Sequence, residues 1–157
     1  MWSKNRSLHL SRIAVAAFMV VLAAAAVAAP ALTRWFLSSR PWLPAGAALP
    51  AQRRLWALFL VSEYASVPLA AVTLWELRGL LARIGAAQVF VPKNEQALRR
   101  ISWACFAEAA VCLASSFYYA AFLVVAVAAA FMALIVRVVK NVFAEAIALK
   151  DENDYTI

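Results

Sequence analysis

Glycine, histidine and cysteine are scarce in this chain of 157 residues, which holds three glycines, one histidine and two cysteines. With so few glycines there is no glycine-rich phosphate loop, and the motifs HExxH and GxSxG do not occur. The single histidine, His9, stands far from both cysteines and leaves no spaced set of ligands for a metal ion. We therefore expect neither an enzyme nor a protein that holds a metal or another cofactor.

Charged residues are also few, at 15% of the chain, whereas 66% of the residues are hydrophobic. A soluble protein of this length needs more polar surface than that to cover its core. The fifteen Lys and Arg residues exceed the eight Asp and Glu residues and give a net charge of +7, but they flank apolar runs instead of alternating with aromatic residues. We predict an integral membrane protein in contact with the lipid bilayer and without direct contact with nucleic acid.

The apolar runs predict four helices, at about 11–34, 53–84, 95–118 and 120–150. About twenty apolar residues are enough to cross a bilayer, and the first two runs exceed that length. The last two helices share one run, 101–136, in which Glu108 is the only charged residue. A single helix of this length would measure roughly 54 Å, nearly twice the hydrocarbon core. The run must therefore fold back on itself, and we place the reversal at 115–120.

These helices predict a single all-α domain over 1–157, with four transmembrane helices in an antiparallel bundle. The connections are an outer loop at 35–52, a cytoplasmic loop at 85–94 and an acidic tail at 151–157. Beyond Val136 the helical spacing of apolar residues continues among charged ones, with one stripe formed by Val139, Val142, Ala146 and Leu149. We therefore predict that the fourth helix extends into the cytoplasm.

Lysine and arginine are distributed unevenly about the predicted helices. Eleven lie in the N-terminal segment, in 78–100 and from Arg137 onward, whereas four lie between Arg34 and Arg54. Because cytoplasmic segments carry the excess of basic residues, we predict that both termini and the 85–94 loop face the cytoplasm. An even number of membrane helices agrees with this orientation.

The outer loop is flanked by tryptophan. Trp35, Trp42 and Trp56 surround a stretch that contains three prolines, one glycine and two serines. Tryptophan favours the headgroup zone of a membrane, where its ring and its single N–H are both accommodated. The pattern indicates an interfacial belt, and the alternative is a ligand-binding cap on the outer face.

Three glutamates lie at membrane depth, where an ionisable group is costly and is a candidate for function: Glu63, Glu76 and Glu108. Counted from the cytoplasmic loop, Glu76 and Glu108 stand at similar depths on neighbouring helices, and Arg137 approaches the same layer. We predict a polar cluster of these three residues, either a structural ion pair that fixes helix register or a proton- or cation-responsive site. Glu63 lies closer to the bilayer middle, with Tyr64 or a neighbouring helix as its candidate partner.

Two motifs resemble a known family. The stretch VFVPKNEQALRRIS is similar to one in which an aromatic residue, an Asn and a later Leu-Arg or Leu-Lys precede a third helix, and LKDENDYTI resembles the closing motif LKEENDLTI. By these motifs the chain resembles the bacterial membrane family called domain of unknown function 2975. The chain differs from it at Asp151, at Tyr155, and at Ala86 or Ala87, where the family commonly has Gly.

The resemblance implies four helices in the bacterial cytoplasmic membrane and no established activity. Genes of this family often sit beside a small helix-turn-helix regulator, which implies a cytoplasmic DNA-binding partner. We expect a regulatory or sensory protein whose docking face combines the loop and the acidic tail. The candidate docking residues are Asn94, Arg99, Arg100, Asp151, Glu152, Asn153 and Asp154.

The alternative function is that of a small transporter or channel subunit, a homo-oligomer with Glu63, Glu76 and Glu108 along a polar route. A water-accessible cavity that joins these carboxylates would favour transport. A dry, packed bundle with an exposed cytoplasmic platform would favour docking. Homo-oligomer formation stays open under either interpretation.

Overall fold

The computed structural model describes residues 4–39 and 49–154 of the chain. These residues form four helices and no strand: α1 Lys4–Ser38, α2 Leu49–Gly85, α3 Pro92–Ser115 and α4 Ala121–Asp154. The predicted all-α class with four helices is therefore confirmed. Of the predicted outer loop, residues 40–48 lie outside the described residues, and so do residues 155–157 at the end of the tail.

Helices α1, α2 and α4 are longer than the apolar runs from which they were predicted. Helix α1 starts within the basic N-terminal segment at Lys4, and α4 continues to Asp154 through most of the predicted tail. Helix α3 begins at Pro92 and ends at Ser115, and a short turn then leads to α4. Charged residues can continue a helix in water, so the apolar runs mark only the parts that suit lipid.

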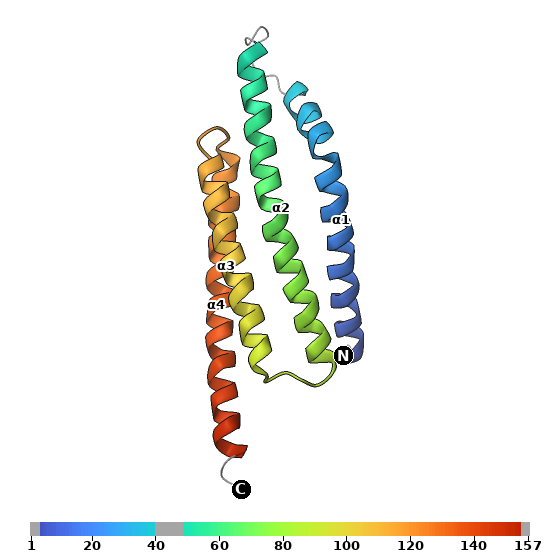
Figure 1. The fold of residues 1–157 in the computed structure, drawn as a ribbon, viewed down its shortest axis with the longest axis vertical. Coiled ribbons are helices and arrows are strands. Elements are labelled where there is room, and N and C mark those ends of the chain that lie inside the picture. The colour runs from blue at the N-terminus through green and yellow to red at the C-terminus, as the bar shows by residue number, and fades with distance from the viewer. Residues whose placement is uncertain (1–3, 40–48, 155–157) are drawn as a thin grey trace.

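Consecutive helices pack against each other and run in opposite directions (Figure 1). Helix α1 packs on α2, α2 on α3, and α3 on α4. Over the part of the chain that the structure describes, the backbone of α1 does not come close to that of α3 or α4. The helices thus pack in chain order, and their closure into an antiparallel bundle stays a prediction.

Three helices contain segments long and apolar enough to cross a membrane: Ser7–Ser38, Gln52–Gly85 and Ala121–Lys150. Large apolar side chains on these segments point outward, such as Val27 with 84% of its surface exposed and Val124 with 73%. Helix α3 does not meet this standard. The turn between α3 and α4 divides the apolar run 101–136. Helix α3 therefore contains only residues 101–115 of this run, which follow the charged residues Arg99 and Arg100.

An aromatic core joins the helices at the end of the molecule where α3 turns into α4. The buried ring of Phe59 on α2 lies 5.1 Å from Tyr118, and 5.7 Å from Phe36, from Tyr119 and from Phe122. These partners come from α1, from the turn and from α4. Aromatic pairs at such centroid distances stabilise by about 0.5–1.5 kcal/mol each beyond the area they bury.

Small residues bring α3 and α4 close together. Ala104 on α3 and Ala126 and Ala133 on α4 are buried, and the Ser102 hydroxyl donates a hydrogen bond of 3.0 Å to the carbonyl oxygen of Ala133. Membrane helices associate through small side chains and interhelical hydrogen bonds, because lipid offers no hydrophobic driving force between them.

Helix α2 ends in a Schellman motif whose left-handed residue is Ala87, with φ of 59°. The N–H of Gln88 donates to the carbonyl of Arg83 at 3.0 Å, and the N–H of Ala87 donates to that of Ile84 at 3.1 Å. Glycine usually occupies this position because a Cβ is strained there. Ala87 is one of the two positions, 86 and 87, at which the family resemblance implies a Gly.

Replacing Ala87 with Gly should stabilise the protein by about 0.5–1 kcal/mol, because it removes the strain of a Cβ at positive φ. Thermal unfolding of the purified protein in detergent would show this as a rise in melting temperature. Ala86→Gly is the matched control: Ala86 has a negative φ, so a glycine there adds only flexibility and should lower the melting temperature. Equal shifts for both variants would contradict this account of the turn.

Candidate functional site

Asn94 fastens the loop between α2 and α3. Its side chain is fully buried, and its Nδ2 donates hydrogen bonds to the carbonyl oxygens of Gln88 at 2.9 Å and Val89 at 2.7 Å. Its Oδ1 accepts a hydrogen bond of 2.6 Å from Nε of Arg83 on α2. The amide of Asn94 is thus bound inside the loop, and the part of Asn94 in the docking face stays a prediction.

The start of α3 is formed without a side-chain cap. Val91 occupies the N-cap position in an extended conformation, and Pro92 follows it within the first turn. Proline suits that position, because the N–H it lacks would have no partner in the helix. Asn94 stands two residues after Pro92 in the same turn, and its amide binds back to the loop.

The shorter of the two ion pairs among the described residues joins Glu76 on α2 to Arg100 on α3. Arg100 Nη1 lies 2.6 Å from Glu76 Oε1, and the side chains are 66% and 15% exposed, respectively. Because Arg100 is mostly exposed, the pair adds little to stability but orients its guanidinium. Arg99, the neighbouring docking candidate, is exposed and lines a groove between α2 and α3 together with Gln96 and Trp103.

Glu108 lies in an apolar cavity of about 470 Å³ lined by residues of all four helices. Its Oε1 accepts hydrogen bonds from the Ser66 hydroxyl on α2 at 2.8 Å and from the Cys112 thiol at 3.3 Å. Its Oε2 is buried and has no partner among the described residues. The cavity therefore holds one carboxyl oxygen that is free to accept a hydrogen bond or a positive charge.

Arg137 packs on aromatic rings. Its Cζ lies 5.7 Å from the ring centre of Trp103 and 6.0 Å from that of Phe106, both on α3. The predicted cluster of Glu76, Glu108 and Arg137 is thus divided in the structure, because each of the three has different partners. The two glutamates stand at similar distances from the loop along their helices, but Glu76 pairs with Arg100 and Glu108 pairs with Ser66.

Glu63 has its partner on α1. The Thr33 hydroxyl donates to its two carboxyl oxygens at 3.2 and 3.0 Å, and Thr33 is buried. Of the two candidate partners, Tyr64 donates instead to the carbonyl oxygen of Ala26 at 3.2 Å. The observed partner of Glu63 therefore comes from the neighbouring helix α1.

The last part of α4 packs against the loop and the start of α3. Lys140 Nζ lies 3.8 Å from Glu95 Oε1, and the rings of Phe90 and Phe143 are 6.1 Å apart. Ile147, one turn further along, is buried. The predicted stripe lies on the outer side instead, with Val139 39%, Val142 59% and Leu149 65% exposed.

The acidic candidates of the predicted tail stand in the last turn of α4. Asp151, Glu152, Asn153 and Asp154 belong to the helix, and the side chain of Glu152 is exposed. The side chains of Asp151, Asn153 and Asp154 lie outside the described residues. Helix α4 therefore continues through these four positions.

Sequence reasoning missed the hydroxyl groups that hold the buried acids. Thr33 and Ser66 bind Glu63 and Glu108, and Arg83 reaches Asn94 from the preceding helix. A small polar residue within an apolar helix is a signal for such a contact, but it does not say which acid it meets. Within residues 4–39 and 49–154, no group of three His, Cys, Asp or Glu residues could hold a metal ion, and both cysteines are free thiols.

Comparison with known proteins gives one match. The model of the family described as "Protein of unknown function (DUF2975)" matches residues 42–157. Neither a curated protein nor a solved structure matches the chain. The matched region covers α2, the loop with Asn94, α3 and α4.

Replacing Asn94 with Ala should destabilise the protein by about 2–4 kcal/mol, because two loop carbonyls and Arg83 Nε would lose their partner inside the fold. Thermal unfolding in detergent would measure the loss. Lys93→Ala is the control, since Lys93 is an exposed neighbour with no partner among the described residues, and it should shift stability by less than about 0.5 kcal/mol. An unchanged melting temperature for Asn94→Ala would refute the anchoring role.

Proposed function

The chain belongs to the family of proteins of unknown function DUF2975, and on that premise we propose that it is a regulatory or sensory protein of the bacterial cytoplasmic membrane. In this proposal all four helices cross the membrane and both termini face the cytoplasm. The protein acts by holding a cytoplasmic partner on the loop side. It does so without catalysis and without a cofactor.

The distribution of basic residues supports the orientation. Eleven of the fifteen Lys and Arg residues lie in the N-terminal segment, in 78–100 and from Arg137 onward. In Figure 1 the start of α1, the α2–α3 loop and the end of α4 all lie toward the same end of the molecule. If all four helices cross the membrane, including α3 as the least apolar, these three basic segments lie on the same side of it.

The length of α4 is the observation that carries the docking proposal. Its 34 residues measure about 51 Å, against about 30 Å for a hydrocarbon core. Figure 1 shows α4 running past the ends of α2 and α3 on the loop side. A crossing that starts at Ala121 is complete near Lys140, so Val142 and Leu149 stand in water with most of their surface exposed. An exposed apolar stripe in water indicates an interaction surface.

The chemistry of this surface fits a DNA-binding regulator. Val139, Val142 and Leu149 supply apolar contact, and the acidic positions Asp151 and Glu152 follow directly on the same helix. Acidic groups complement the basic surface with which such regulators bind DNA. A helix-turn-helix regulator, which the family resemblance suggests, would thereby be held at the membrane and away from DNA.

A second candidate is the transporter or channel subunit. The observation in its favour is the partnerless Oε2 of Glu108 in the cavity between the four helices. However, Glu63 and Glu76 do not line that cavity and are bound to Thr33 and Arg100 instead. A polar route needs a connected series of such groups, so the docking function is better supported.

Replacing Val142 and Leu149 together with Asp should weaken binding of a purified helix-turn-helix regulator from the same bacterium by at least about tenfold, because the apolar contact with that regulator would be lost. The full-length protein in nanodiscs, titrated with the labelled regulator, gives the measurement. Removal of 151–157 should weaken binding in the same direction. Glu108→Gln should leave binding unchanged, because Glu108 lies far from this surface.

Asn141→Asp combined with Ala148→Asp is the matched control, because it adds the same two charges to the adjacent exposed face of α4. If both double variants lose the same affinity for the regulator, general charge repulsion explains the loss. That result would contradict the proposal that the stripe binds the regulator. If the regulator binds all variants alike while Glu108→Gln abolishes cation flux into proteoliposomes, the transporter is the correct function.

A further inference from the structure

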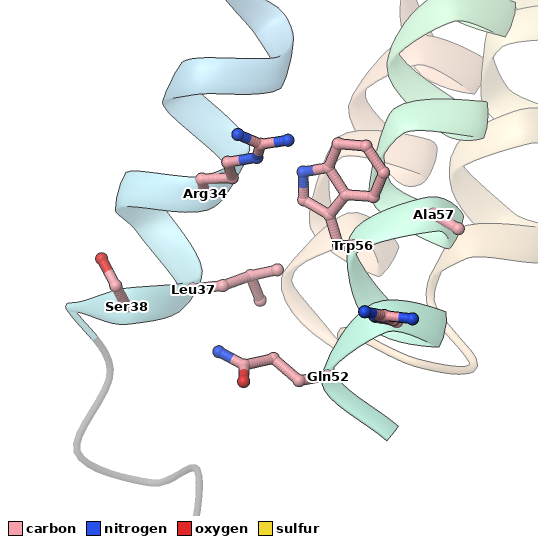
Figure 2. A pocket seen from close by; sticks show the side chains of 7 residues that line it. Arg34, Leu37, Ser38, Gln52, Trp56 and Ala57 are labelled. Atoms are coloured by element: carbon pink, nitrogen blue, oxygen red, sulfur yellow. The ribbon is translucent and has the colours of Figure 1, made fainter. Parts of the chain in front are cut away.

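A pocket of about 540 Å³ lies between the end of α1 and the start of α2. Figure 2 shows the side chains that line it, at the end of these helices opposite the α2–α3 loop. The polar lining residues are Arg34, Ser38, Gln52, Arg53 and Trp56, and the apolar ones are Leu37 and Ala57. This pocket is separate from the docking face, and its lipid assignment rests only on the membrane placement within the proposed function.

The indole N–H of Trp56 has no hydrogen-bond acceptor among the described residues, although the nitrogen is buried. Figure 2 shows that this nitrogen faces α1 across the pocket. A buried donor without an acceptor is costly, so an acceptor atom from a ligand would be stabilised at this point. Arg34 fixes the ring from one side, with its Cζ 5.3 Å from the ring centre.

Two arginines give the pocket a positive charge that no acid offsets. Across the described residues, no carboxylate lies within ion-pair distance of Arg34 or Arg53, and the lining contains no Asp or Glu. Glu63, the acid that follows on α2, is already bound by the Thr33 hydroxyl. An arrangement of guanidinium and N–H donors without a competing acid selects an anion, and guanidinium groups bind phosphate in a bidentate manner.

The position along the helices suits a lipid headgroup. The first apolar segment ends at Ser38 and the second begins at Gln52, so the pocket lies where both helices leave the hydrocarbon core. Phosphate groups of lipids occupy this level, and tryptophan is typical of it. Leu37 and Ala57 provide an apolar surface next to the two arginines.

We propose that this pocket binds the phosphate group of an anionic glycerophospholipid. Arg34 and Arg53 pair with the phosphate oxygens, and the indole N–H of Trp56 donates a hydrogen bond to one of them. The glycerol and the first carbons of an acyl chain lie along Leu37 and Ala57. The bound lipid then links the ends of α1 and α2.

Titration of the purified full-length protein with short-chain phosphatidylglycerol in neutral detergent tests this assignment by calorimetry. Phosphatidylcholine of the same chain length and inorganic phosphate should each bind at least about tenfold more weakly, because one lacks net charge and the other lacks the apolar part. Arg34→Gln and Arg53→Gln should each weaken binding of phosphatidylglycerol by about tenfold or more. Trp56→Phe keeps a ring for Arg34 and removes only the N–H, so it should weaken binding by about threefold to tenfold.

Arg54→Gln is the matched control, because it removes the same charge from the same turn of α2 but does not line the pocket, and it should leave the affinity unchanged. If Arg54→Gln weakens binding as much as Arg53→Gln, general surface charge explains the binding and the site is overturned. If inorganic phosphate binds as tightly as the lipid and responds to the same variants, the pocket is a site for free phosphate. Unchanged affinity in Trp56→Phe together with Arg34→Gln would refute the assigned contacts.

Discussion

The hydrogen bonds of Asn94 are the constraint on which the loop side of the molecule depends. Arg83 near the end of α2 and the carbonyls of the loop meet on this one buried amide at the start of α3. Because all the donors and acceptors are inside, the chain cannot shift between α2 and α3 without leaving buried polar groups unpaired. The fixed connection is what brings Arg100 opposite Glu76 and presents Glu95 to Lys140 on α4.

Within the apolar layer, Glu63 and Glu108 each have a separate hydroxyl donor on a neighbouring helix. Thr33 binds Glu63 from α1, and Ser66 binds Glu108 from α2. A hydroxyl donor lowers the cost of a carboxyl group in lipid without a countercharge, and each such bond also fixes the rotation of one helix against the next. Acids that are held by separate partners fit a role in fixing the register of the helices. A conduction route would instead need the acids to share one cavity.

The apolar runs predicted the four helices and the fold-back between α3 and α4, because bilayer thickness limits how long one crossing can be. The partners of Glu76 and Glu108 could not be predicted in this way. Their contacts depend on the rotation of each helix about its own axis, and a helix that is apolar on all sides carries almost no sequence signal for that rotation. The burial of Asn94 could not be predicted for a related reason, since the sequence around Pro92 is equally compatible with an exposed and a buried Asn.

The arginines of this chain make two kinds of contact, and their surroundings decide which one. Arg83 donates its Nε to a buried amide and Arg100 pairs with Glu76 through Nη1, so each is held by a hydrogen bond within the protein. Arg34 and Arg137 instead lie over aromatic rings. Contact with a ring stabilises the positive charge without an acceptor atom, so the N–H groups stay available. At a membrane surface, where phosphate is abundant, an arginine held beside a ring can bind an anion through these N–H groups.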